Sequence, residues 1–231
     1  MILNKISLCI AGLSLLSGLK IYADINSNKP KGDINNQFPV VLLIGDSIRM
    51  GYAPLVKQQL ANKAIVKWPE ENCEDSGKIL NNIEKYIELN KPDLIYINCG
   101  LHDIKSERGT NKKKNPIETY ESNLNKIISV IKSKGIKILW ASTTPVIEEW
   151  HNKIQSFDRL NKDINQYNEI ASKVMLAQGI RIIDHYQVIE KADKQASFKK
   201  DGVHYTDKGS EILSATVSQE IIKSLTDVNR N

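Results

Sequence analysis

Five short apolar segments alternate along this chain with longer segments whose apolar residues recur at helical spacing. The short segments are rich in Ile, Val and Leu, a composition typical of strands that are buried on both faces. They comprise residues 40–44, 64–68, 94–98, 136–141 and 180–184. Strands separated by helices favour a parallel sheet with helices on both faces. The sequence therefore predicts an α/β fold with three layers, α/β/α, around a five-stranded parallel sheet.

The residues that follow the first four predicted strands carry the candidate chemistry. In parallel sheets of this kind, ligands bind outside the carboxyl ends of the strands. The side chains at these four strand exits are Ser47, Cys73, His102 and Thr143. We therefore expect these four residues to face one crevice.

The amino-terminal segment has the layout of a secretory signal peptide. Residues 1–23 begin with a basic stretch, continue with an apolar run over residues 6–19 and end on the small residue Ala23. The run is too short to predict a membrane span, although a retained anchor is the alternative. We expect cleavage after Ala23, export to the periplasm or the medium, and no stable membrane insertion afterwards. Residues 24–37 predict a flexible lead-in, and residues 38–228 predict one folded domain.

The net charge is too small to indicate a nucleic-acid partner. Residues 1–23 contain Lys5 and Lys20 and no acidic residue, so their removal lowers the formal charge from +5 to +3. The three consecutive lysines at residues 112–114 are typical of a solvated loop. We therefore expect a small-molecule or glycan substrate and no nucleic acid.

Cysteine usage leaves one question open. Export would leave Cys73 and Cys99 as the two cysteines of the mature chain, both beside predicted active-site loops. In an oxidising compartment they could pair, but a sequence gives no distance between them, so a disulfide and two free thiols are both compatible with it. No spacing of Cys and His residues indicates a metal site. We expect neither a metal nor another cofactor.

A serine, a histidine and an aspartate occupy positions from which they can act together. Ser47 lies on the predicted turn between the first strand and the following helix, and Asp201 and His204 precede a helix expected to begin after Thr206. A serine hydroxyl becomes a strong nucleophile when a histidine takes its proton, and a carboxylate orients that histidine. We predict Ser47 as the nucleophile, His204 as the general base and then acid, and Asp201 as the orienting carboxylate. Taken singly, Ser47 is equally typical of a helix N-cap and Asp201 of a turn.

Three ordered motifs resemble those of the SGNH, or GDSL-type, hydrolases. They are Gly-Asp-Ser-Ile at residues 45–48, Gly-x-x-Asp at residues 100–103 and Asp-x-x-His at residues 201–204. The resemblance covers residues 38–225, and the segments at 98–105 and 140–146 look like stretches typical of one esterase subgroup. It implies a flavodoxin-like sheet and the same roles for Ser47, Asp201 and His204. It also implies hydrolysis of carboxylic esters through an acyl-serine intermediate, without a cofactor.

The resemblance also implies an oxyanion hole, from which this sequence departs. The family usually uses the amide of the serine, the amide of a glycine after the second strand, and an asparagine side chain in a Gly-x-Asn-Asp loop. This chain has His102 where that asparagine is expected, and an imidazole N–H can donate one hydrogen bond. Cys73 has the spacing from His102 that the glycine would have. We therefore predict the backbone amides of Ser47 and Cys73 and the side chain of His102 as the three donors.

Two further residues are candidates for binding substrate. Arg49 lies beside the nucleophile, where it can bind an anionic group or form a salt bridge with Asp46 or Asp103. Thr143 ends the fourth predicted strand and is expected to line the pocket.

The subgroup and the predicted export together indicate an exported serine esterase that removes acetyl or another short acyl group from a carbohydrate. One alternative is a lysophospholipase or thioesterase of the same fold. Another is a non-catalytic carbohydrate-binding module, which the replacement of asparagine by His102 keeps open.

Overall fold

The computed structural model describes residues 38–227. The predicted signal peptide at residues 1–23 and lead-in at residues 24–37 lie outside the described residues. Within residues 38–227, no helix has the length and apolar character needed to cross a membrane.

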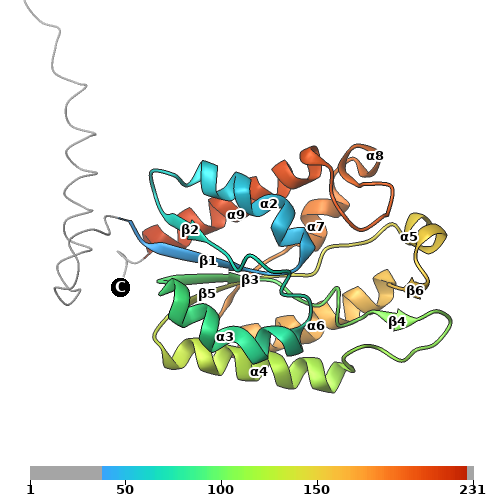
Figure 1. The fold of residues 1–231 in the computed structure, drawn as a ribbon, viewed down its shortest axis with the longest axis horizontal. Coiled ribbons are helices and arrows are strands. Elements are labelled where there is room, and N and C mark those ends of the chain that lie inside the picture. Colours follow the sequence, from blue (N-terminus) through green and yellow to red (C-terminus); the bar gives the residue numbers. More distant parts are fainter. Residues whose placement is uncertain (1–37, 228–231) are drawn as a thin grey trace, which may run out of the picture. The chain divides into compact units, whose positions relative to one another are not determined.

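Five parallel strands form the central sheet, in the order β2-β1-β3-β5-β7 (Figure 1). They are β1 (Val40–Ile44), β2 (Ile65–Lys67), β3 (Leu94–Ile97), β5 (Lys137–Ala141) and β7 (Arg181–Ile183). In chain order the strands therefore run 2-1-3-4-5 across the sheet, which is the flavodoxin-like order. The predicted strands match to within one or two residues at each end. The prediction of an α/β fold with a five-stranded parallel sheet is confirmed.

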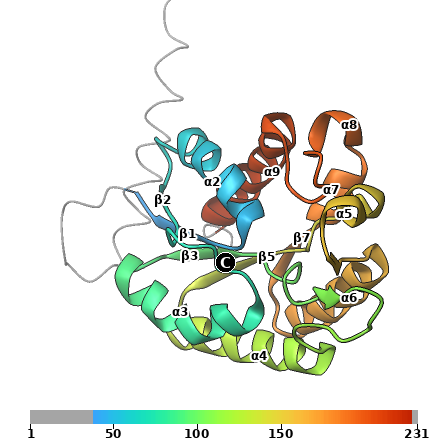
Figure 2. The ribbon, with the colours of Figure 1, turned by 45° about the vertical axis from the view of Figure 1, so that its right-hand side comes forward.

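Helices cover both faces of this sheet (Figures 1 and 2). One face carries α2 (Ser47–Gln59), α7 (His185–Glu190), α8 (Lys194–Ser197) and α9 (Asp207–Thr226). The other face carries α3 (Ser76–Asn90), α4 (Ile117–Ser133) and α6 (Asn161–Ala177). Because each long helix presents one apolar stripe, packing against the sheet buries that stripe and leaves the polar side in water. The predicted three-layer α/β/α arrangement is confirmed.

Short polar side chains fix where the helices begin. Asp46 accepts a hydrogen bond from the Ile48 amide at the start of α2, and Thr206 accepts one from the Gly209 amide at the start of α9. Such caps stabilise a helix by about 1 kcal/mol each, because they satisfy amides that have no partner in the first turn. Since Asp46 is the cap of α2, the hydroxyl of Ser47 is not needed for this purpose.

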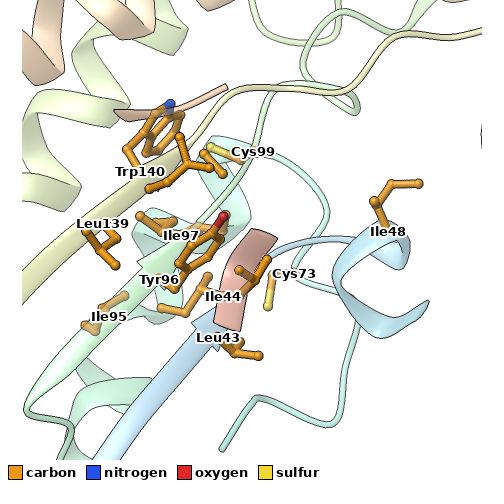
Figure 3. Close-up of a cluster of buried hydrophobic side chains, with 14 of the residues drawn as sticks. Leu43, Ile44, Ile48, Cys73, Ile95, Tyr96, Ile97, Cys99, Leu139 and Trp140 are labelled. Atoms are coloured by element: carbon orange, nitrogen blue, oxygen red, sulfur yellow. The ribbon is translucent and has the colours of Figure 1, made fainter. Parts of the chain in front are cut away.

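A buried apolar cluster lies directly beneath the carboxyl ends of the strands (Figure 3). Leu43 and Ile44 of β1 pack there with Tyr96 of β3, and each is fully buried. Burying a side chain of this size contributes about 1.5–3 kcal/mol to stability, so the cluster gives the site above it a rigid base. Cys73 and Cys99 belong to the same cluster and are both free thiols. This answers the question that the sequence left open.

Two very short strands form a second sheet that the sequence does not predict. The strands β4 (Ser106–Glu107) and β6 (Phe157–Asp158) pair antiparallel, with Ser106 opposite Asp158. Between β5 and β6 lies the equally short helix α5 (Glu148–Ile154). Strands of two residues are too short to show an alternating pattern, which explains why only the folded chain shows them.

Candidate active site

Ser47, His204 and Asp201 form a continuous hydrogen-bonded chain. The Ser47 Oγ lies 2.8 Å from His204 Nε2, and His204 Nδ1 lies 2.6 Å from Asp201 Oδ2. Ser47 and His204 are 157 residues apart in the sequence. The sheet brings them together, because β1 ends at Ile44 and the loop before α9 passes beside it. The three residues therefore have the contacts that their predicted roles require.

The backbone holds the Asp201 carboxylate in place. Its Oδ1 accepts hydrogen bonds from the amides of Val203 and His204, each at 2.9 Å. Burial raises the pKa of Asp201, but these two amides and the His204 ring outweigh it and lower that pKa below its usual range. The carboxylate is therefore ionised at neutral pH and can keep a proton on His204 Nδ1.

Gly202 allows the tight turn between Asp201 and His204. Its φ of +68° lies in the left-handed region, and a Cβ at this position would clash with the carbonyl oxygen of Ile147. The Gly202 carbonyl accepts a hydrogen bond of 2.7 Å from the Ile147 amide. The turn is thus fastened to Ile147, the residue just before α5.

Ser47 is the first residue of α2, at the positive end of the helix dipole. Within residues 38–227 its backbone amide makes no hydrogen bond, unlike the Ile48 amide, which Asp46 occupies. An unoccupied amide beside the serine oxygen is a suitable donor for a developing oxyanion.

His102 lies on the loop after β3, near Asp46, the cap residue of α2. Its Nε2 lies 3.9 Å from Asp46 Oδ2, beyond hydrogen-bond distance, and its side chain is 18 % exposed. Burial lowers the pKa of His102 more than the nearby Asp46 carboxylate raises it. The ring is therefore neutral at pH 7 and carries one N–H, as an oxyanion donor of the predicted kind needs.

Asp103 anchors the His102 loop to the start of α3. Its Oδ1 accepts hydrogen bonds from the Ser76 hydroxyl at 2.5 Å and from Asn115 Nδ2 at 2.8 Å, and both carboxylate oxygens lie 3.1 Å from the Ser76 amide. Burial raises the pKa of Asp103 to about 6 despite these donors. Asp103 is fully buried and holds the neighbouring His102 in place.

The structure contradicts the predicted substrate contact of Arg49. This side chain is 1 % exposed, and its guanidinium donates to the carbonyl oxygens of Gly45 at 3.3 Å and Glu71 at 2.7 Å. It also forms no salt bridge with Asp46 or Asp103. Arg49 instead ties the turn before Ser47 to the loop after β2.

The structure also contradicts the predicted pocket position of Thr143. Its side chain is 2 % exposed, and its hydroxyl donates to the Cys99 carbonyl oxygen at 3.1 Å. The Asn168 side chain accepts from its amide at 2.7 Å. Thr143 therefore packs beneath the Gly100 loop and stabilises it.

The Cys73 amide is not a free donor. It already donates to the Gly45 carbonyl oxygen at 3.2 Å. The prediction of this amide in the oxyanion hole is therefore wrong for the described conformation. Of the three predicted donors, the Ser47 amide and the His102 side chain are still available.

A cleft of about 670 Å³ opens beside His102. Lys105, Ser106 and Phe157 line one part of it, so the small β4–β6 sheet forms a wall. His102 also lines the cleft, which connects this space to the loop that carries the candidate oxyanion donor. Within residues 38–227, no three His, Cys, Asp or Glu side chains are grouped as ligands for a metal ion.

Sequence reasoning missed Arg159, which follows β6. This side chain is 7 % exposed, and its Nε donates to the Leu101 carbonyl oxygen at 2.9 Å, next to His102. Its guanidinium carbon lies 5.1 Å from the centre of the Phe157 ring. The sequence gives no signal for this position, because the segment around it has neither a strand nor a helix period.

Comparison with known proteins gives consistent matches. The model of the GDSL-like lipase/acylhydrolase family matches residues 43–212. The isoamyl acetate-hydrolyzing esterase 1 homolog of Homo sapiens is 26 % identical over 194 residues, which cover 76 % of this chain and 78 % of that protein.

Two solved structures illustrate the shared fold. A lipase/acylhydrolase from Enterococcus faecalis is 22 % identical with a TM-score of 0.66, over 80 % of this chain and 96 % of that one. A catalytic mutant of an acetylxylan esterase from Geobacillus stearothermophilus is 19 % identical with a TM-score of 0.63, over 79 % of this chain and 94 % of that one. At these identities the likeness shows the fold.

Proposed function

The chain belongs to the GDSL-like lipase/acylhydrolase family, and on this premise we propose that it is an exported serine esterase that removes acetyl or another short acyl group from a carbohydrate. The observation that carries the catalytic part is the hydrogen-bonded chain from Ser47 through His204 to Asp201. The amino-terminal sequence motivates export. The carbohydrate is motivated by the subgroup motifs at residues 98–105 and 140–146 and is compatible with the acetylxylan esterase fold.

The proposed reaction has two stages. His204 Nε2 accepts the proton of Ser47 as Oγ attacks the ester carbonyl carbon, and the C=O electron pair moves onto the oxygen. The tetrahedral intermediate collapses when His204 returns that proton to the leaving alcohol oxygen, which leaves acyl-Ser47. Water then attacks the acyl carbon while His204 accepts its proton. The second intermediate collapses by breaking the bond between the acyl carbon and Ser47 Oγ, and His204 returns the proton to Oγ, which releases the acid and restores the Ser47 hydroxyl. Throughout, Asp201 keeps the proton of His204 on Nδ1.

In the proposed reaction, the Ser47 amide and the His102 ring both donate to the negative oxygen of the two intermediates. Because the Cys73 amide is occupied by Gly45, these two donors share the stabilisation. Preorganised donors of this kind act strongly, since they need no rearrangement when the charge develops.

Replacing His102 with alanine is therefore expected to lower kcat by about 10²–10³-fold with little change in KM. His102→Asn, which restores an N–H donor on a shorter side chain, is expected to recover part of that loss. Steady-state kinetics on a short p-nitrophenyl ester would measure both effects.

His151 offers a matched control for that experiment. Unlike His102 it is fully buried, and its ring packs edge-on against Phe157 with the ring centres 5.1 Å apart. His151→Ala is expected to lower the melting temperature more than it lowers kcat. If His102→Ala instead shifts the melting temperature and leaves kcat nearly intact, His102 only packs against its loop.

The substrate class is tested with a panel of esters. We expect the protein to react with a fluorophosphonate at Ser47 and to hydrolyse acetylated sugars faster than lysophospholipids or thioesters. Preferential hydrolysis of a lysophospholipid or a thioester would replace the carbohydrate proposal. A correctly folded protein that is neither labelled nor active on any ester would indicate a binding module. Mass spectrometry of the exported chain, expected to begin at Asp24, tests the localisation.

A further inference from the structure

Arg159 is held rigidly beside the candidate active site. Its Nε is fixed by the Leu101 carbonyl oxygen at 2.9 Å, and its guanidinium packs against Phe157 at 5.1 Å from the ring centre. Leu101 directly precedes His102, so the guanidinium lies on the loop that carries the candidate oxyanion donor. With 7 % of the residue exposed, this position has little freedom to swing into solvent.

The two terminal nitrogens of Arg159 have no protein partner. Within residues 38–227, no hydrogen bond or salt bridge engages Nη1 or Nη2, and neither is enclosed. Burial lowers the pKa of Arg159, and Asp46 and Asp201 raise it, so both carboxylates are near. Neither comes within the 4.0 Å of an ion pair. A buried cation without a close counter-ion costs free energy, and an anion that reaches Nη1 and Nη2 would remove that cost.

A second cation without an ion pair in the described part of the chain, Lys105, packs against the Phe157 ring. The Lys105 ammonium lies 3.9 Å from the centre of the Phe157 ring and has no salt bridge within residues 38–227. Two other lysines of the cleft are neutralised, since Lys113 pairs with Asp163 and Lys114 pairs with Asp75.

The unpaired charges that line the cleft therefore have a positive balance. Besides Lys105, Lys112 lacks an ion pair in the described part of the chain, and among the acidic lining residues only Glu107 lacks one. With Arg159 beside them, the space next to His102 favours an anion over a neutral group.

We propose that Arg159, assisted by Lys105, binds a carboxylate of the ester substrate beside Ser47. The planar guanidinium presents parallel N–H groups that match both oxygens of a carboxylate, and the aromatic ring keeps that plane in place. This proposal deepens the esterase function and rests on it. The carboxylate belongs either to the acyl part, as in a half-ester of a dicarboxylic acid, or to the alcohol part, as in an acetylated uronic acid.

Substrate pairs that differ in one charge test this proposal. On the acyl side, p-nitrophenyl hydrogen succinate is compared with p-nitrophenyl butyrate. On the alcohol side, an acetylated methyl glucuronoside is compared with the same acetylated methyl glucoside. For each pair, the preference is kcat/KM for the acidic ester divided by kcat/KM for the neutral ester. In one of the two pairs, Arg159→Gln is expected to lower this preference by about 10- to 100-fold, which is the range for a charge-assisted hydrogen bond. Arg159→Lys is expected to retain part of the preference.

The matched control is Arg181→Gln. Arg181 is 42 % exposed at the start of β7 and pairs with Glu220, so its loss is expected to leave both ratios unchanged. If Arg159→Gln also leaves both ratios unchanged while ester hydrolysis persists, the carboxylate site is refuted and the esterase function stands. If the wild-type protein hydrolyses none of the four esters, the esterase function is what fails.

A binding measurement is independent of turnover. The Ser47→Ala protein is titrated with succinate and with methyl glucuronoside, followed by nuclear magnetic resonance, against butyramide and methyl glucoside as neutral probes. Tighter binding of one acidic probe, lost when Arg159→Gln is added and only weakened when Arg159→Lys is added, supports the proposal. Equal binding of acidic and neutral probes overturns it. Melting curves of each variant show whether the fold is retained, and the lysine variant serves if the glutamine variant does not fold.

Discussion

Replacing Ser47 with alanine is expected to lower kcat for a short p-nitrophenyl ester by about 10⁴–10⁶-fold. The Ser47 hydroxyl contacts His204 Nε2 at 2.8 Å, and no other hydroxyl of residues 38–227 does so. The fold is expected to be intact, since Asp46 and not Ser47 caps α2. Steady-state kinetics and a melting curve measure the two expectations together.

Ser133→Ala provides the matched control for that substitution. Ser133 lies at the end of α4, and its hydroxyl donates to the Val130 carbonyl oxygen on the exposed surface. Activity is expected to be unchanged in this variant. A Ser47→Ala protein that kept even a tenth of the wild-type kcat would show that the nucleophile is another residue.

The second large effect is expected for Asp201→Asn, with a loss of about 10³–10⁴-fold in kcat. The asparagine has the same shape, and its oxygen can still accept from the amides of Val203 and His204. Its NH₂ group would then face His204 Nδ1, which must give up its proton to accept that hydrogen bond. The proton moves to Nε2, and this tautomer cannot take the proton of Ser47.

Kinetics and thermal melting separate this tautomer effect from a loss of structure. Asp201→Asn is expected to melt within a few degrees of the wild-type protein and to show a nearly unchanged KM. The control is Asp227→Asn, the same substitution at an exposed aspartate at the end of α9, and we expect it to leave kcat unchanged. A rise in KM at constant kcat in the Asp201 variant would assign Asp201 to substrate binding and not to His204.

Elements that depend on local chemistry could be predicted from the order of the residues. The strand β1 begins and ends where its apolar run does, and α9 begins at Asp207 because the preceding Thr206 is a good cap. The order of strands and helices then leaves few topologies, since parallel crossovers have one hand. The contact between Ser47 and His204 could be predicted from the sequence, because each residue lies in a motif whose position in that topology is known.

Which polar groups are free to bind or react depends on the packing of segments that are distant in the sequence. The sequence does not distinguish Arg49 from Arg159, yet the Nη2 of Arg49 is bound by two carbonyl oxygens, whereas Arg159 donates through Nε and its Nη1 and Nη2 have no partner among residues 38–227. The Cys73 amide is occupied by Gly45, across two strand exits. Such pairings join segments that are distant in sequence, and their distances depend on how the sheet stacks its loops. The periodic pattern of apolar residues predicts the fold. Which donors and acceptors are already paired depends on how the folded chain packs.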